Sequence, residues 1–95
     1  MLVFADEFRF SPSRRTLPAG VLRLQLKNIG EDDHDLRILG PKGGRQGETG
    51  IVHPDGLRQI RVTLARGRYT FFCTVAHHAK NGMKFTVVVT RRARG

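Results

Sequence analysis

The chain has 95 residues, enough for one domain with a single core of modest size. Its 39% hydrophobic content includes no apolar run as long as a membrane span, which excludes a transmembrane helix in this sequence. Lysine and arginine number 17 against 8 acidic residues, giving a net charge of +9. The basic residues are spread along the chain, which favours attraction to acidic partners over a dedicated nucleic-acid surface.

The first half of the chain is predicted to form short strands separated by turn residues. Residues 3–10 alternate roughly between apolar and polar side chains, and Ser-Pro-Ser at 11–13 interrupts them. A short strand at 16–17 leads into the turn Pro-Ala-Gly. Residues 21–28 alternate cleanly with period two, which predicts a strand with one apolar face. After an Asn-Ile-Gly turn, residues 34–38 are predicted to form another short strand.

The second half continues this pattern after a loop. Residues 40–50 are rich in glycine and poor in apolar side chains, so we expect a loop there. Strands are predicted at 57–64, at 68–73, where the strand ends at a cysteine, and at 83–90, which is rich in β-branched residues. About seven or eight short strands with regular turns predict an all-β fold, a Greek-key antiparallel β-sandwich.

Soft metal ligands are concentrated in one predicted loop. The chain has one cysteine and one internal methionine, and both lie in the run Cys73-Thr-Val-Ala-His-His-Ala-Lys-Asn-Gly-Met83. A further imidazole, His34, occurs in Asp-Asp-His-Asp-Leu. Two histidines and one cysteine with a weak axial methionine describe a blue-copper electron-transfer site. A single cysteine excludes both an internal disulfide and a binuclear copper centre with two bridging cysteines.

The order of these residues resembles a known family. Cys73-x4-His78-x4-Met83, after Tyr-Thr-Phe-Phe and before Phe-Thr-Val-Val, resembles the ligand loop of the cupredoxins, the plastocyanin- and azurin-like blue-copper proteins. Asn28-Ile-Gly, followed by Asp-His34-Asp-Leu, is similar to the segment that supplies their first histidine. The resemblance covers nearly the whole chain and implies one cupredoxin-like domain at residues 1–90, followed by a basic tail at 91–95.

The resemblance also implies a ligand set and an activity. His34 and His78 would be the imidazole ligands of one type 1 copper ion, Cys73 the thiolate and Met83 the weak axial ligand. Members of the family carry single electrons by cycling between Cu(I) and Cu(II), so the chain is expected not to be an enzyme. The family relation further implies a periplasmic or other extracytoplasmic location, although the N-terminus has no signal-peptide pattern.

Two positions depart from the family pattern. Loops of this spacing commonly carry Pro-Gly before the second histidine, whereas this one carries Ala76-His77, so His77 competes with His78 for the ligand role. His77 is otherwise a solvated loop residue or a pH-sensitive contact at a docking surface. The residue after the first histidine is often Asn or Ser in the family, and here it is Asp35. Its carboxylate either alters the metal's potential from beside the ligands or caps a turn.

The partner and several alternative functions follow from the remaining residues. We expect a redox protein partner with an acidic docking surface, because Lys80 and Lys84 flank the ligand loop.

The alternatives are a type 1 copper domain of a larger oxidase or reductase, a copper-handling module, a zinc site and a nucleic-acid binder. Phe72 and Thr74 replace the histidines that flank the cysteine in multicopper oxidases. Methionine is a poor zinc ligand, and no aromatic–basic nucleic-acid motif occurs. The sequence leaves the oligomeric state open.

Overall fold

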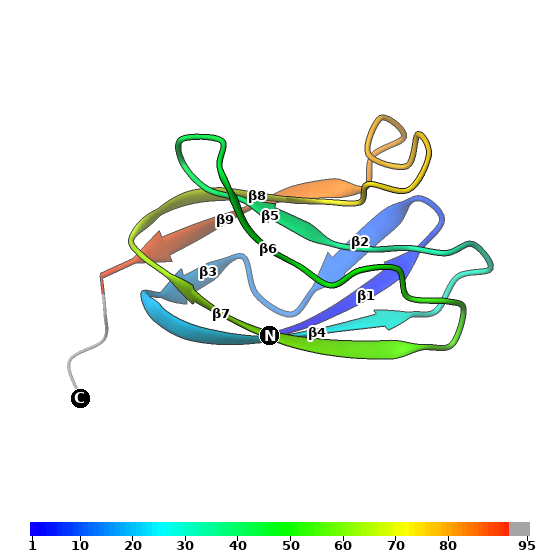
Figure 1. Cartoon of the computed structure of the whole chain (residues 1–95), viewed down its shortest axis with the longest axis horizontal. Helices are drawn as coiled ribbons and strands as arrows, with labels where there is room; N and C mark the ends of the chain where they lie inside the picture. The colour runs from blue at the N-terminus through cyan, green and yellow to red at the C-terminus, as the bar shows by residue number, and fades with distance from the viewer. Residues whose placement is uncertain (92–95) are drawn as a thin grey trace.

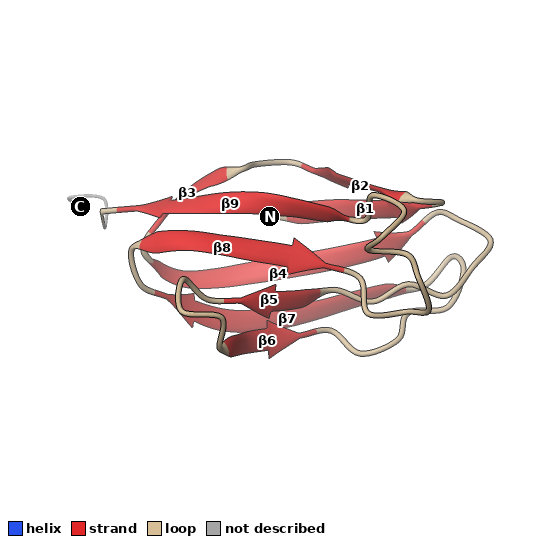
Figure 2. Ribbon diagram, turned by 90° about the horizontal axis from the view of Figure 1, so that it is seen from above, coloured by secondary structure: helices blue, strands red, loops and turns tan. Residues whose placement is uncertain are grey.

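The structure, a computed structural model, describes residues 1–91 and consists of two β-sheets packed face to face (Figure 1; Figure 2). One sheet has the strand order β2-β1-β4-β7 and the other β3-β9-β8-β5-β6. The strands are β1 (Leu2–Asp6), β2 (Arg9–Pro12), β3 (Thr16–Pro18), β4 (Gly20–Asn28), β5 (Arg37–Leu39), β6 (Arg45–Glu48), β7 (Leu57–Leu64), β8 (Gly67–Phe72) and β9 (Lys84–Thr90). The predicted all-β sandwich is therefore confirmed.

Residues 1–91 form nine strands where seven or eight were expected, and most pairs are antiparallel as expected, but each sheet also contains one parallel pair. β1 lies parallel to β4, and β3 lies parallel to β9, while the other pairs are antiparallel. The chain leaves the first sheet after β2, adds β3 to the second sheet and then returns to the first as β4. Those two crossovers bring β4 alongside β1 in the same direction, an outcome that alternation along one strand does not reveal.

Two further expectations need correction. Residues 3–10 form parts of two strands, because the chain reverses at Glu7 and Phe8 and β2 pairs back onto β1. That turn lacks the Gly, Pro or Asn that usually marks a reversal. Residues 40–50 are not all loop, because β6 pairs with β5 at the edge of the second sheet. An edge strand needs little apolar burial, and β6 has three exposed residues among its four.

The core lies between the sheets and follows the period-two patterns of the strands. In β4, Leu24 and Leu26 are fully buried, and in β9 the residues Phe85, Val87 and Val89 face inward while their neighbours face solvent. Burying each such side chain contributes roughly 1.5–3 kcal/mol. Of the two phenylalanines before Cys73, Phe71 is the one that is fully buried in the core, and its ring centroid lies 5.1 Å from that of Phe85.

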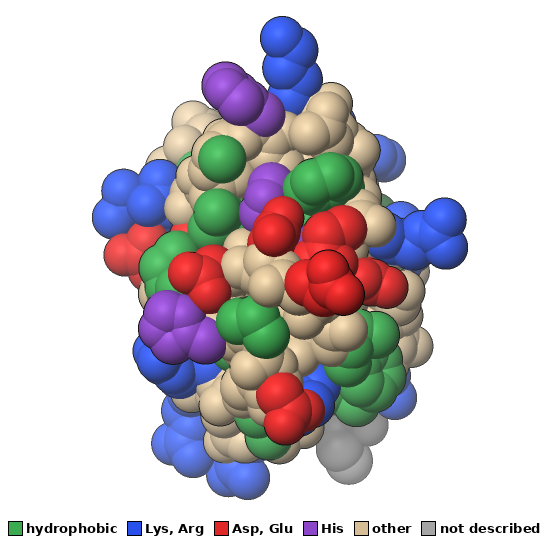
Figure 3. Space-filling model, turned by 90° about the vertical axis from the view of Figure 1, so that its right-hand side faces the viewer, with side chains coloured by type: hydrophobic (Ala, Val, Ile, Leu, Met, Phe, Trp, Pro, Cys, Tyr) green, Lys and Arg blue, Asp and Glu red, His purple; other side chains and the backbone are tan. Residues whose placement is uncertain are grey.

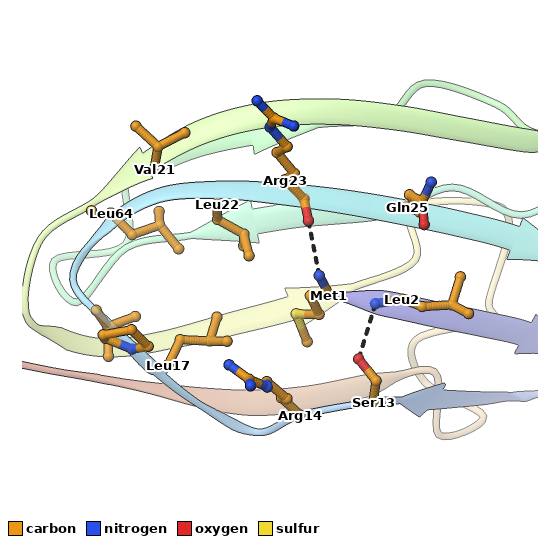
Figure 4. A pocket seen from close by; sticks show the side chains of 13 residues that line it. Met1, Leu2, Ser13, Arg14, Leu17, Val21, Leu22, Arg23, Gln25 and Leu64 are labelled. Carbon is orange, nitrogen blue, oxygen red and sulfur yellow. Dashed lines mark hydrogen bonds between the residues drawn. The ribbon is translucent and has the colours of Figure 1, made fainter. Parts of the chain in front are cut away.

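The two ends of the elongated molecule differ. The turns after β1, β4 and β8 meet at one end, and the C-terminal end of β9 lies at the other (Figure 1). Toward the latter end an open hollow of about 690 Å³ is lined by polar and apolar residues of β3, of β4 and of the chain near the N-terminus (Figure 4). Its lining includes no His, Cys, Asp or Glu.

No helix able to cross a membrane occurs among residues 1–91. Residues 92–95 of the predicted basic tail lie outside the described residues.

Candidate metal centre

The loop between β8 and β9 is closed at its base by its own end residues. Cys73 follows the last residue of β8, and its backbone N–H donates to the carbonyl of Met83, just before β9 begins. That bond continues the β8–β9 ladder by one step, so the loop is anchored to two central strands of the second sheet. Cys73 and Met83 are 2% and 0% exposed, which turns both sulfur-bearing side chains away from solvent.

Tight turns fold the rest of the loop back over its base. The N–H of His78 donates to the carbonyl of Val75, and the carbonyl of His78 accepts from the N–H of Met83. Ala76 has a φ of +43°, a left-handed conformation that side chains with a Cβ rarely adopt. His78 is 6% exposed, whereas its neighbour His77 is exposed to solvent. The fold thus buries the histidine that the Cys-x4-His-x4-Met spacing favours.

A second segment brings His34 to the same end of the sandwich. The amide of Asn28, at the end of β4, donates to the carbonyls of Asp32 and Val52 and accepts from the N–H of Gly30. His34 then pairs with Val52 through two backbone hydrogen bonds, of 3.1 and 2.7 Å. Because Asn28 is fully buried, these bonds fix the turn before His34 against the interior.

The ligand atoms of His34, Cys73 and His78 all lie within 4.8 Å of one another. The Sγ atom of Cys73 is 3.6 Å from Nδ1 of His78, and the two imidazole rings are 4.9 Å apart between centroids. His34 is fully buried, and its Nδ1 has no hydrogen-bond partner. A buried ring nitrogen without a partner is costly unless something else binds it. The three residues therefore form a compact set of soft and borderline ligands.

The turn between β1 and β2 contacts both histidines through adjacent residues. The carboxylate of Glu7 lies 3.1 Å from Nε2 of His34 and also accepts the backbone N–H groups of Glu31 and Asp32. The ring of Phe8 packs on that of His78, with 4.7 Å between centroids. Sequence reasoning placed Asn28 in the segment of the first histidine but missed Glu7 and Phe8, because no local spacing links those two residues to a ligand.

Asp35 connects the two ligand segments. Its Oδ1 accepts the backbone N–H of Thr74 at 2.5 Å, and its Oδ2 accepts the Thr74 hydroxyl. Burial raises the pKa of the Cys73 thiol above its usual range, while hydrogen bonds from the backbone N–H groups of Asp35 and Val75 act in the opposite direction. These N–H groups stabilise the thiolate, the form in which cysteine binds metals.

Lys80 and Lys84 predict a basic surface at this end, and both side chains are exposed. Acidic side chains nevertheless gather there. Figure 3 faces this end and shows acidic side chains gathered beside a histidine, with most of the basic side chains toward the edge. The acidic residues lie in the turns that meet here: Asp6, Glu7, Glu31, Asp32, Asp33 and Asp55. The carboxylate of Asp32 is 3.6 Å from Nε2 of His78. His53 is exposed and bonds to Asp33, outside the buried cluster.

The donor set fits a soft or borderline metal ion. One buried sulfur and two imidazoles converge, and the unpartnered Nδ1 of His34 needs a group that accepts its lone pair. Thiolate and imidazole together suit copper, and the buried sulfur of Met83 at the base of the loop favours copper over zinc.

Comparisons of the sequence and the structure with known proteins identify a family and a fold. A family model described as the sulfocyanin (SoxE) domain matches residues 23–93. Reduced auracyanin from the photosynthetic bacterium Roseiflexus castenholzii is 22% identical, with 94% of both chains covered and a TM-score of 0.83. Auracyanin A, a "blue" copper protein from Chloroflexus aurantiacus, is 19% identical over 95% of this chain and 97% of its own, with a TM-score of 0.82.

Reduced rusticyanin shares the fold at greater distance, with 20% identity, 94% and 78% coverage and a TM-score of 0.71. No curated protein sequence matched the chain. At these identities the structural likenesses establish the fold, and the family match rests on the sequence of residues 23–93.

Proposed function

This chain belongs to the sulfocyanin (SoxE) domain family and has the cupredoxin fold, and we propose that it is a blue-copper electron carrier with one type 1 ion. The proposed ligands are His34, Cys73, His78 and Met83. The observation that carries the proposal is the set of three buried residues whose ligand atoms lie within 4.8 Å of one another, and His34 among them also has a ring nitrogen without a partner. Bound copper would supply a one-electron couple between Cu(I) and Cu(II).

The chain's own residues support this use in two ways. The ligands lie in two segments that are fixed to the sandwich and to each other by backbone and side-chain hydrogen bonds, so the site needs little rearrangement when the charge of the ion changes. His34 and Cys73 are shielded from solvent, and His78 lies nearest the surface, between the ring of Phe8 and the carboxylate of Asp32. The cluster therefore provides a buried donor set for one ion.

Copper titration of the metal-free protein tests the proposal. Addition of Cu(II) should produce an intense visible band from sulfur-to-copper charge transfer, and Cys73→Ser should abolish it. His77→Ala and His78→Ala form a matched pair from adjacent positions, and only the second should remove the band. The proposal is wrong if no band forms or if Cys73→Ser retains it. If His77→Ala alone removes the band, the ligand assignment is displaced by one residue.

The alternative of a domain from a larger oxidase or reductase gains no specific support. Phe72 and Thr74 flank Cys73, so no histidine beside the thiolate could conduct electrons to a second copper cluster. A copper-handling role would need ready release of the ion, whereas His34 and Cys73 are almost fully buried.

The partner is a redox protein, and two charge arguments predict opposite signs for its docking surface. The net charge of +9 predicts an acidic surface, which could meet Lys80 and Lys84. The carboxylates beside His34 and His78 predict a basic one. Electron exchange with an anionic iron cyanide complex and a cationic ruthenium ammine complex separates these predictions. A rate with the anionic complex that falls as salt rises would support the acidic partner, because salt screens attraction.

We place the protein in an extracytoplasmic compartment, with residues 1–90 as the domain and 91–95 as a tail. Family membership supports the location, and the end of β9 at Thr90 supports the boundary. Deletion of residues 91–95 should leave the melting temperature unchanged, and a fall of several degrees would contradict the boundary. Fractionation of the native host with detection of this protein tests the location.

A further inference from the structure

We infer that Glu7 is a positioning residue of the metal centre, whose carboxylate holds the His34 ring with its proton on Nε2 and its Nδ1 lone pair directed at the ion. This inference rests on the proposed ligand role of His34. Three observations carry it: the 3.1 Å contact between Oε1 of Glu7 and Nε2 of His34, the complete burial of the His34 ring, and the unpartnered state of its Nδ1.

The chemistry of the contact fixes which nitrogen carries the proton. A neutral imidazole has one N–H and one lone pair, and an ionised carboxylate can only accept. The Oε1 atom of Glu7 already accepts two backbone N–H groups, so the carboxylate oxygen is placed as an acceptor toward the His34 ring as well. Glu7 is therefore the acceptor, Nε2 of His34 is the donor, and Nδ1, which has no hydrogen-bond partner, keeps its lone pair.

The carboxylate is itself held in place. Its Oε1 accepts from the backbone N–H groups of Glu31 at 2.8 Å and Asp32 at 2.7 Å as well as from His34. A Cβ added at Gly30 would overlap both carboxylate oxygens, with Oε2 at 2.7 Å. Glycine at this position therefore lets the carboxylate lie against the backbone of the turn before His34. The side chain links the β1–β2 turn to that segment.

A fixed anion one ring away from the ion has a second consequence. It interacts more favourably with Cu(II) than with Cu(I), because the oxidised centre carries one more positive charge. Glu7 should therefore lower the reduction potential of the site, besides orienting the ligand. A carboxylate that accepts from a ligating histidine is a recurrent device for fixing the tautomer and raising the basicity of the ring.

The experiment compares Glu7→Gln and Glu7→Ala with Glu31→Gln, a matched loss of one acidic side chain that makes no contact with His34. In the metal-free protein, nitrogen NMR of the imidazoles should show His34 protonated on Nε2 in the wild type and in Glu31→Gln. In Glu7→Ala the two tautomers should mix. Copper affinity, measured by competition with a chelator, should fall about 10- to 100-fold in Glu7→Ala and less in Glu7→Gln, which retains an amide oxygen as acceptor.

Measurement of the reduction potential separates the effect of the Glu7 charge from the effect of its hydrogen bond to His34. Both Glu7 variants should favour Cu(I) about tenfold more than the wild type, equivalent to a rise of about 59 mV for one electron. Gly30→Ala should displace the carboxylate without altering its chemistry and should also mix the tautomers of His34. This variant keeps the test valid if Glu7→Ala does not fold.

Two outcomes overturn the inference. One is a His34 proton on Nδ1 in the metal-free wild type, and the other is Glu7 variants that match Glu31→Gln in tautomer, affinity and potential. The tautomer measurement needs no metal, so it tests Glu7 even if the wild type fails to develop the blue band that the proposed function requires.

Discussion

Replacement of Asp35 by alanine should destabilise the metal-free protein more than any other single loss of charge near the ligands. Asp35 is 6% exposed, follows His34 in the chain and accepts both the N–H and the hydroxyl of Thr74, which follows Cys73. The two hydrogen bonds therefore join segments 39 residues apart. A hydrogen bond to a charged group contributes about 1.5–3 kcal/mol, so the loss of both should cost at least about 3 kcal/mol.

That cost is a large part of the free energy of unfolding of a small domain, which is about 5–15 kcal/mol. Asparagine retains the shape and can accept the Thr74 N–H, so Asp35→Asn should lose only about 1 kcal/mol. Thr74→Val removes one bond and leaves the N–H paired, so its cost should be about 1.5 kcal/mol. Asp33→Ala is the control, because Asp33 bonds only to the exposed ring of His53.

Urea unfolding of the metal-free variants measures these differences through the transition midpoint, provided that the slope stays constant. Metal-free protein is used because bound copper would add its own binding free energy to the folded state. The reasoning is refuted if Asp35→Ala unfolds within about 0.5 kcal/mol of Asp33→Ala, the usual range of surface substitutions.

Three other substitutions test separate features of the site. Asn28→Ala removes a buried amide with three hydrogen bonds to backbone, so urea unfolding should show a loss of about 3 kcal/mol, and a loss under 1 would contradict its role in the turn. Met83→Leu conserves volume and should retain the visible band with a raised reduction potential, because the axial thioether favours Cu(II); an unchanged potential in voltammetry would exclude axial ligation. Ala76→Gly relieves the positive φ and should stabilise the fold by up to about 1 kcal/mol, whereas a loss in thermal unfolding would show that the loop needs the Cβ.

Strands with a buried face were predictable because their pattern is local. β7 spans 57–64 as expected, and β9 differs by one residue from the expected 83–90. β6 was missed because an edge strand of polar residues and glycine buries too little to show a period. The division of residues 3–10 was missed because Glu7 and Phe8 form the turn in place of the usual turn residues.

The metal centre was likewise predictable only in part from the sequence. The residue types and spacing of Cys73, His78 and Met83 mark a loop with metal-binding chemistry, and the burial of His78 and exposure of His77 agree with that spacing. Glu7 could not be predicted, because its contact with His34 spans 27 residues and depends on how the β1–β2 turn packs against the end of β4. The same limit applies to the charge at this end, since Lys80 and Lys84 are neighbours of the ligands in sequence while the acidic side chains are neighbours only in space.

The placement of charges at the two ends has an electrical consequence for the molecule as a whole. Acidic side chains gather at the ligand end, whereas Arg66, Arg68 and Arg91 line one surface hollow at the other end of an axis 41 Å long. Opposite charges separated in this way give the molecule a permanent dipole along its long axis, in addition to its net charge of +9. In an external electric field, such as that of a charged partner, the dipole exerts a torque that turns the ligand end toward positive charge and the arginine end toward negative charge.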